Sequence, residues 1–255
     1  MIVCDLDRTL LNRDGALSEY TLDVWEKCRQ MGILLAFATA RPNRATRRFV
    51  EVARPDVIIT DGGALALVDG VVVYRAILPG ATVNKILQIL KGSAGVSYIT
   101  ASADHGHFTN YPIDPDDAAW AEWKFIFTDF SEKIDCDIYK IGPEIFDKAV
   151  IGEITALPDV LYTPFSSENW CSFNHAGATK WQAVQKVAQH LNIDTNSIAA
   201  FGDDFSDIEM LQNCGVGVAV ANAIDEVKVV ADFVCDSNGD DGVARWLEAN
   251  LCKLR

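Results

Sequence analysis

The fold of this chain is organised around its first ten residues, MIVCDLDRTL (residues 1–10). The apolar run 2–4 is typical of a short buried strand. Asp5 and Asp7 follow with a spacing of two, which on an extended strand places both carboxylates on one face at the carboxyl end, where open parallel sheets bind ligands. Two converging carboxylates repel each other unless a cation, a proton or a bound substrate intervenes, and Mg²⁺ takes such oxygen ligands. Taken alone, the pair would better suit a helix N-cap and a turn after an ordinary strand.

The composition predicts a soluble, cytoplasmic protein whose partner is neither nucleic acid nor a membrane. The 255 residues carry a net charge of −14, whereas nucleic acid and anionic membranes attract a basic face. The longest apolar runs, residues 33–38 and 216–221, are too short to span a bilayer. A carboxylate at position 5 is not expected in a usual signal peptide, and the seven cysteines lack a metal-binding spacing. We therefore expect reduced cysteines and a cytoplasmic location, and the sequence leaves the oligomeric state open.

Apolar and amphipathic stretches alternate in both terminal parts of the chain, as a parallel α/β sheet requires. Ser18 is placed to cap a helix that runs to about Gln30, and Gly32 is placed to end it. Asp69-Gly70 between two apolar runs indicates a hairpin. Strands are expected at residues 2–4, 33–38, 57–60, 198–201, 216–220 and 232–235. These patterns predict an α/β fold with a Rossmann-like parallel-sheet core.

The pattern changes in the middle of the chain. An amphipathic stretch at residues 83–90 leads to short alternating strands instead of another strand–helix repeat. A helix with antiparallel strands inside a parallel fold is typical of a separate, inserted α+β domain. The sequence therefore predicts a core made of residues 1–78 and 172–255 and an inserted domain at 79–171.

Four segments resemble, in order along the chain, the motifs of the haloacid dehalogenase superfamily. Residues 5–11 (DLDRTLL) are similar to its Asp-x-Asp-Gly-Thr-Leu motif, and the others are ATARP at 38–42, GATK at 177–180 and GDDFSD at 202–207. The resemblance spans essentially the whole chain and is closest to the Cof-type phosphatases, whose type IIB cap is inserted where residues 79–171 lie. It implies a magnesium-dependent phosphatase with a cap that closes over the site.

The resemblance assigns the central chemistry to aspartates. Asp5 is the candidate nucleophile, because a carboxylate can form an aspartyl-phosphate and so divide one difficult displacement into two easier ones. Asp7 would protonate the leaving oxygen and later take a proton from the hydrolytic water. In the family the Asp7 backbone carbonyl, and not its side chain, touches the magnesium ion. Metal ligation also transfers to Asp203, together with Asp5, whereas Asp204 and Asp207 are candidates for a ligand, for the surrounding layer or for a helix cap.

Phosphate binding is expected from the second and third motifs. Thr39 and Ala40 end a predicted strand, where a hydroxyl and free backbone N–H groups suit a phosphoryl oxygen, although Thr before a helix is also a common cap. Lys180 stands at a helix start, where the helix dipole does not favour a cation, so we expect it to pair with Asp5 and the transferring phosphate. The remaining predicted substrate-binding residues are Leu6, Arg41, Ser206 and Asn222.

Two residues depart from the family pattern. Arg8 replaces the usual Gly of the first motif, which alters the turn after Asp7 and adds a charge near the cleft. Ser206 replaces the Asn that Cof-type members usually carry, at a position that often touches the substrate or orients the metal site. Outside the motifs, Trp120 and Trp123 lie one helical turn apart and are expected either to pack as a stripe or to line a lid.

We predict a phosphoric monoester hydrolase that uses Mg²⁺ and acts on a small phosphorylated metabolite. The resemblance to the family, and not these residues themselves, favours a sugar phosphate as that metabolite. A phosphomutase related to the phosphomannomutases shares the cap type and the first motif, but it would have to retain its bound intermediate for a second transfer. A non-catalytic protein that senses phosphate or metal is the third alternative. Lys180 and a large cap argue against a sensor, since a sensor needs no lid that excludes water.

Overall fold

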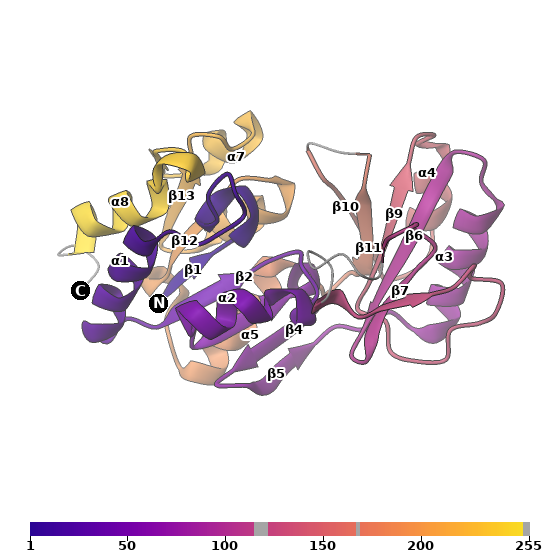
Figure 1. Cartoon of the computed structure of the whole chain (residues 1–255), viewed down its shortest axis with the longest axis horizontal. Coiled ribbons are helices and arrows are strands. Elements are labelled where there is room, and N and C mark those ends of the chain that lie inside the picture. Colours follow the sequence, from indigo (N-terminus) through magenta and orange to yellow (C-terminus); the bar gives the residue numbers. More distant parts are fainter. Residues whose placement is uncertain (115–121, 167–168, 252–255) are drawn as a thin grey trace.

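The computed structural model describes residues 1–114, 122–166 and 169–251, and these residues form two β-sheets (Figure 1). The first sheet has the strand order β14-β13-β12-β1-β2-β3-β4-β5. The strands from β14 to β3 are parallel, and β4 and β5 continue the sheet antiparallel. The strands are β1 (Ile2–Cys4), β2 (Leu35–Ala38), β3 (Val57–Thr60), β4 (Leu65–Val68), β5 (Val71–Arg75), β12 (Ala199–Gly202), β13 (Val216–Val220) and β14 (Phe233–Cys235). The predicted parallel core and its hairpin are confirmed.

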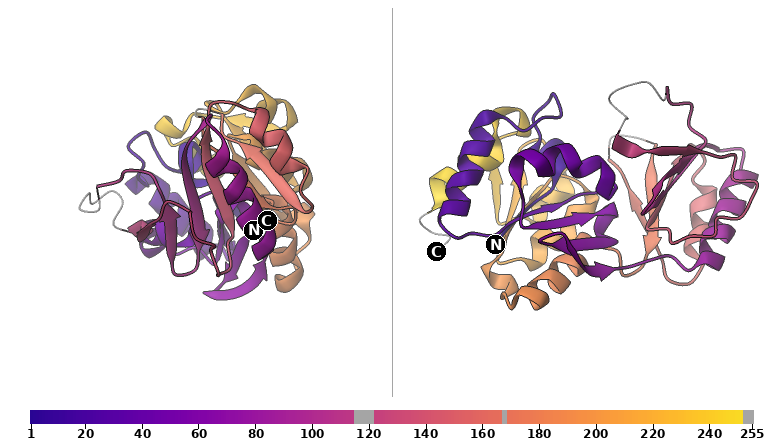
Figure 2. Two further views of the ribbon diagram at one scale, coloured as in Figure 1. Left: turned by 90° about the vertical axis from the view of Figure 1, so that its right-hand side faces the viewer. Right: turned by 60° about the horizontal axis from the view of Figure 1, so that its bottom comes forward.

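Helices cover both faces of this sheet. They are α1 (Glu19–Gln30), α2 (Arg47–Ala53), α5 (Lys180–Leu191), α6 (Ile208–Asn213), α7 (Asp225–Val230) and α8 (Gly242–Asn250). One group is α1 with its neighbours α2 and α8, and the other is α6 with its neighbours α5 and α7 (Figure 2). The Ser18 hydroxyl caps α1 by accepting from the Thr21 N–H at 2.9 Å, and Gly32 adopts a left-handed φ of +77° just after the helix.

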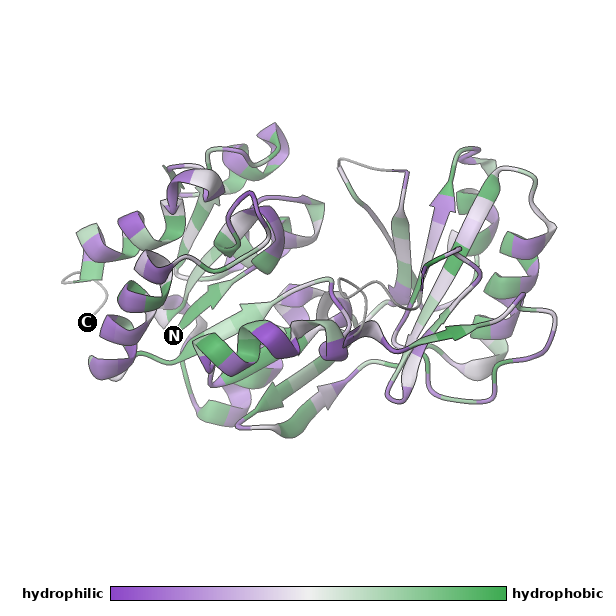
Figure 3. Ribbon diagram, viewed as in Figure 1, coloured by the Kyte–Doolittle hydropathy of each residue, from purple (hydrophilic) through white to green (hydrophobic). Residues whose placement is uncertain are grey.

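Apolar side chains between the sheet and its helices form the main core. Val3 and Phe37, on the central strands β1 and β2, are fully buried, and Trp25 of α1 packs on Phe37 with ring centroids 5.6 Å apart. The strands are predominantly hydrophobic, whereas hydrophilic residues lie on the outer sides of the helices (Figure 3). Within the described ranges no helix has both the length and the apolar character that crossing a membrane requires.

The second sheet, with its two helices, forms the cap. Its strand order is β10-β11-β9-β6-β7-β8, antiparallel except for the β7–β8 pair. A separate apolar cluster joins it to the two helices, which lie on the side away from the first sheet (Figures 1 and 2). The elements are β6 (Val96–Ala103), β7 (Gly106–Thr109), β8 (Phe125–Phe127), β9 (Lys140–Ile145), β10 (Val160–Pro164), β11 (Cys171–His175), α3 (Gly80–Gly92) and α4 (Ala149–Thr155).

The strand β11 bears on where the inserted domain ends. The sequence placed the boundary between residues 171 and 172, inside this strand. All five residues of β11 pair with β10, and Asn174 also pairs with Lys140 of β9. Because these hydrogen-bonded pairs tie the whole strand to the second sheet, we propose that the cap extends to His175 and that the core resumes after it.

Candidate active site

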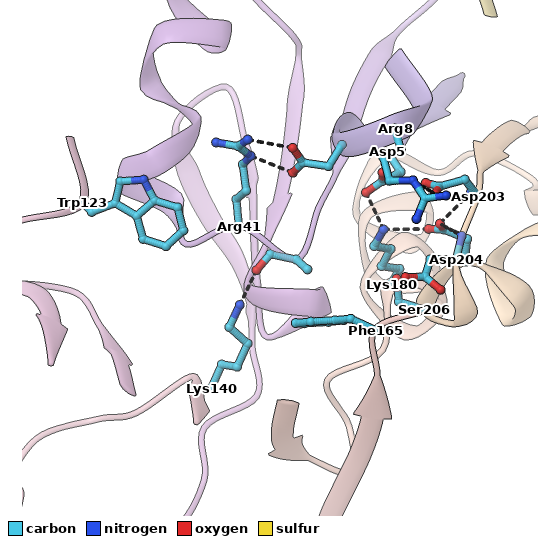
Figure 4. Close-up of a pocket in the computed structure, with 13 residues that line it drawn as sticks. Asp5, Arg8, Arg41, Trp123, Lys140, Phe165, Lys180, Asp203, Asp204 and Ser206 are labelled. Atoms are coloured by element: carbon cyan, nitrogen blue, oxygen red, sulfur yellow. Dashed lines mark hydrogen bonds and ion pairs between the residues drawn. The ribbon is translucent and has the colours of Figure 1, made fainter. Parts of the chain in front are cut away.

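The carboxyl ends of β1, β2 and β12 meet at one edge of the first sheet, as the sequence predicted. A cavity of about 430 Å³ lies there, between the core and the cap (Figure 4). It is lined by Asp5, Asp7, Arg8, Ala40, Arg41, Trp123, Lys140, Phe165, Lys180, Asp203, Asp204, Ser206 and Asp207. Most of the predicted site residues are therefore brought together, and the exceptions are Thr39, Leu6 and Asn222.

Three buried carboxylates form the centre of the site. Asp5, Asp203 and Asp207 each place one carboxylate oxygen within 4.8 Å of the others. The Lys180 ammonium, which is 1% exposed, lies 2.6 Å from an oxygen of Asp5 and 2.6 Å from an oxygen of Asp207. Thr9 donates to Asp203 at 2.8 Å. The ion pair predicted between Lys180 and Asp5 is thus present, and Lys180 forms a second ion pair with Asp207.

Three carboxylates face a single ammonium group in this cluster, and the pKa values of its residues are shifted accordingly. Burial raises the pKa of Asp5, and Asp207 and Asp203 raise it further against the opposing effect of Lys180. Burial also raises the pKa of Asp203 to about 7, with Asp207 as the next contributor. Burial alone would lower the pKa of Lys180, but Asp207 and Asp5 outweigh it and raise that pKa. An additional cation would relieve the repulsion among the carboxylates.

The donor set fits a magnesium ion. Mg²⁺ prefers hard oxygen ligands, binds through one or two carboxylates and retains positions for substrate phosphate and water. Asp5 and Asp203, at the ends of neighbouring parallel strands, present such oxygens side by side. The only side-chain cation besides Lys180 within 4 Å of the triad, among the described residues, is Arg8, whose Nε is 3.5 Å from Asp203 and whose side chain is 43% exposed. An exposed arginine offsets buried negative charge only weakly.

Asp207 also shapes the loop that carries Asp203. Its second oxygen accepts from the backbone N–H groups of Asp203 at 3.0 Å and Asp204 at 3.1 Å. The Asp204 side chain caps the following turn by accepting from the Phe205 N–H at 2.8 Å, and it accepts from the Ser166 N–H at 3.1 Å. The Asp204 carboxylate therefore lies outside the triad, and the capping role left open by the sequence is the one its contacts support.

Gly202 is required for this loop to pack, which gives a first prediction. A Cβ atom at this position would lie 2.4 Å from Cβ and 2.5 Å from Cγ of Asp207. We expect Gly202→Ala to displace Asp207, to lower the free energy of unfolding by about 1–3 kcal/mol and to weaken the Mg²⁺ dependence of activity. Urea denaturation and magnesium titration of the reaction rate measure both effects. Gly152→Ala in α4, where a Cβ atom has open space, is the matched control, and an equally harmless Gly202→Ala would contradict the packing argument.

Asp7 points away from the triad. Its carboxylate forms two hydrogen bonds with Arg41, at 2.7 Å from Nε and 2.7 Å from Nη2, and its side chain is 48% exposed. This bidentate geometry fixes the Asp7 side chain over the cavity. The contacts of the Asp7 side chain therefore do not support it as a metal ligand.

The turn after Asp7 adapts to the presence of Arg8 where the family usually has Gly. Arg8 adopts a left-handed φ of +60°, which costs a non-glycine residue about 1 kcal/mol. Asn222 compensates, because its amide donates to the Arg8 carbonyl at 2.7 Å, and Asn222 in turn accepts from the Asn238 N–H at 2.8 Å. Asn222 does not line the cavity, and its side chain supports this turn, so the substrate-binding role predicted for it stays a prediction.

Two other predicted residues, Thr39 and Leu6, do not line the cavity. Thr39 is fully buried, its hydroxyl accepts from the Arg41 N–H at 3.1 Å, and its own N–H donates to Ile59 at 2.9 Å. Leu6 is also fully buried, in the apolar core, so only its backbone is available to a ligand. Ala40 and Ser206 line the cavity as predicted.

The cap contributes Lys140, Trp123 and Phe165 to the cavity wall (Figure 4). Trp123 was considered from the sequence as a lid or packing residue, and Trp120 lies outside the described residues. Lys140 was missed, although a lysine within the apolar stretch 138–141 is a signal for a buried, partnered cation. Its ammonium donates to the Ala40 carbonyl, which links the cap to the loop that follows β2 in the core. No sequence signal marks Phe165.

Comparison with known proteins agrees with this architecture. Residues 2–247 match the family described as haloacid dehalogenase-like hydrolase. The 5-amino-6-(5-phospho-D-ribitylamino)uracil phosphatase YitU of Bacillus subtilis (strain 168) is 27% identical over 261 residues, covering 97% of this chain and 96% of the relative. YcsE of the same strain, with the same activity in its name, is 24% identical over 247 residues, covering 96% and 93%.

Solved structures share the fold over the full chain. The subclass IIB sugar phosphatase BT4131 superimposes with a TM-score of 0.84 at 20% identity and covers 100% of this chain and 99% of its own. A haloacid dehalogenase-like hydrolase from B. subtilis reaches a TM-score of 0.86 at 22% identity, covering 97% and 98%. These neighbours confirm the capped α/β fold, and the family match excludes the non-catalytic sensor. The chain therefore belongs to the haloacid dehalogenase-like hydrolases and is an enzyme of the phosphatase type.

Proposed function

We propose that this protein is a magnesium-dependent phosphatase that hydrolyses a small phosphorylated metabolite through an aspartyl-phosphate on Asp5. The observation that carries the proposal is the buried Asp5 carboxylate, held at 2.6 Å by Lys180 within a cluster of carboxylates that fits a divalent cation. A metal ion bound there would offset the negative charge of the phosphate and of the attacking carboxylate.

Two displacements at phosphorus account for the reaction. In the first, an Asp5 oxygen forms a bond to phosphorus while the bond from phosphorus to the ester oxygen breaks, and Asp7 gives the leaving oxygen its proton. In the second, a water molecule attacks the phosphorus of the aspartyl-phosphate, Asp7 takes the water's proton, and Asp5 is released. Lys180 keeps Asp5 oriented throughout, and Arg41 holds Asp7 at the cavity. One of the two hydrogen bonds from Arg41 to Asp7 has to open so that the freed Asp7 oxygen can carry the proton.

The relatives favour hydrolysis of a phosphorylated sugar or polyol. YitU is named for a phosphoribitylamino substrate and BT4131 for sugar phosphates, and both align over nearly the whole chain. Because the named relatives are phosphatases, we prefer net hydrolysis to a mutase reaction, in which the intermediate would be retained for a second transfer.

Removal of the metal tests the proposal. We expect phosphate release from p-nitrophenyl phosphate to fall to background after chelation and dialysis and to return when Mg²⁺ is added, because the carboxylate cluster repels an anionic substrate without it. Colorimetric assay of p-nitrophenol measures both steps. Full activity in the metal-free protein would rule out the metal-dependent mechanism.

A further inference from the structure

A row of polar side chains crosses the cap sheet on the face that is turned toward the core. Asn174 of β11 pairs with Lys140 of β9, Lys140 pairs with Ser102 of β6, and Ser102 pairs with His107 of β7. Directly paired residues of neighbouring strands project to the same face of a sheet. All four are buried, although the opposite face is the one that packs on the cap helices. A buried polar row at this place needs polar partners.

Asp61 of the core, which follows β3, lies against this row. The Asn174 amide donates to the Asp61 backbone carbonyl at 2.9 Å. Asp61 is 1% exposed and His107 is 4% exposed. Among the described residues, neither Oδ1 of Asp61 nor Nδ1 of His107 has a hydrogen-bond partner. Burial raises the pKa of Asp61, and Ser102, Thr60 and the Asn43 backbone lie close enough to its carboxylate to oppose that rise. Leaving a buried polar atom unpaired costs about 1–3 kcal/mol, so two such atoms together indicate a missing ligand or water.

Both unpaired atoms belong to residues that line a second cavity, of about 80 Å³, together with Ser102. The volume has room for roughly two hydroxyl-sized groups. This cavity adjoins the first one. Trp123 lines both, and the loop that gives Ala40 and Arg41 to the first cavity continues directly into Pro42 and Asn43 of the second. A single substrate of modest length can therefore occupy both.

The charges of the second cavity favour an uncharged occupant. Two arginines, Arg44 and Arg47, and two aspartates, Asp61 and Asp104, line it, so the charges of the lining balance. Lys140 also acts on Asp61 and His107, and its ammonium donates to the Ala40 carbonyl. Burial lowers the pKa of His107 to about 3, which leaves the imidazole neutral near neutral pH. An added cation would face the arginines, and an added anion would face the unpaired Asp61 oxygen. Hydroxyl groups can donate to Asp61 and can exchange donor and acceptor roles with His107 and Ser102.

We propose that this second cavity is a hydroxyl-binding subsite that holds the uncharged, polyhydroxylated end of the phosphate ester whose phosphate lies at Asp5. The inference rests on the proposed phosphatase function and adds to it the residues that select the substrate: Asp61, Ser102 and His107. An ester without hydroxyls would leave the polar groups of this cavity unpaired and would therefore bind less well. This difference lets the enzyme discriminate hydroxylated esters from plain alkyl esters.

The test compares two series of phosphate monoesters with the full-length protein and Mg²⁺. Erythritol 4-phosphate, ribitol 5-phosphate and sorbitol 6-phosphate carry hydroxyls, and n-butyl, n-pentyl and n-hexyl phosphate are their counterparts of equal carbon number. We expect kcat/KM to be at least about tenfold higher for each hydroxylated ester, the effect of one or two hydrogen bonds. Ser102→Ala should reduce this ratio by about tenfold. Ser93→Ala, at a cap serine that bonds the Ile89 carbonyl at the end of α3, should leave it unchanged.

Each other outcome has a defined meaning. Equal kcat/KM for the two series, with p-nitrophenyl phosphate still hydrolysed, overturns the subsite and leaves the proposed phosphatase intact. A ratio that survives both Ser102→Ala and Asp61→Asn overturns its assignment to this cavity. Failure to hydrolyse any ester overturns the phosphatase proposal, and calorimetric titration of the same esters then decides the subsite, since equal affinities for the two series would contradict it.

Discussion

Replacing Asp5 with Asn is expected to lower phosphate release from p-nitrophenyl phosphate by about 10⁴-fold or more, the usual scale for loss of a covalent nucleophile. An amide is too weak a nucleophile to attack phosphorus. The fold should persist, because Asn has nearly the same shape and removes one of three carboxylates that repel one another within 4.8 Å. Initial rates and thermal unfolding, measured on the same preparation, separate the two effects.

Asp14→Asn is the matched control for this change. Asp14 is an exposed aspartate in the turn that follows the first motif, and only its backbone N–H bonds the Asn12 side chain. We expect wild-type activity and stability from Asp14→Asn. If Asp5→Asn kept more than about a tenth of the wild-type rate, a nucleophilic role for Asp5 would be untenable.

Lys180→Met is expected to have the largest effect on stability. It would leave Asp5 and Asp207 buried without the cation that now lies 2.6 Å from each. Breaking a buried ion pair by removing one partner lowers the free energy of unfolding by about 3–5 kcal/mol. Activity should also fall to background, because Lys180 orients the nucleophile. Urea denaturation without metal measures the loss of stability.

The loss of stability caused by Lys180→Met should be smaller at low pH than at high pH. The pKa of Asp203 is about 7 in the folded protein and lies near the ordinary Asp value in the unfolded chain, so the folded state binds more protons. Carboxylate repulsion is therefore weak at low pH and grows as pH rises through the folded pKa. We expect Lys180→Met to be less destabilising at about pH 5 than at about pH 8. Lys186→Met, at an exposed lysine of α5, should change stability by less than about 0.5 kcal/mol at either pH. A loss independent of pH would argue against this charge balance.

Much of the fold and of the site could be predicted because short motifs mark where strands end. Asp5, Thr39 and Asp203 each follow a short apolar run, and the carboxyl ends of parallel strands meet at one edge. The caps of α1 and the hairpin at Asp69-Gly70 depend on local chemistry, which the sequence contains directly.

Contacts between distant segments could not be predicted in the same way. The pairing of Asp7 with Arg41 requires the loops after β1 and β2 to adopt particular side-chain geometries. The role of Asn222 depends on the left-handed backbone of Arg8, a conformation that the sequence gives no reason to expect at an arginine. Lys140 reaches the cavity only because its strand register places it on the face opposite the cap helices, and one residue of slip would reverse that face.

Trapping the intermediate tests the covalent mechanism most directly. The enzyme, turning over p-nitrophenyl phosphate with Mg²⁺, is quenched in acid, reduced with borohydride and digested, and the N-terminal peptide is sequenced by mass spectrometry. Reduction of an aspartyl-phosphate converts that aspartate to homoserine. The account predicts homoserine at position 5, with Asp7 unmodified. Homoserine at another position, or turnover in which Asp5 is never modified, would contradict it.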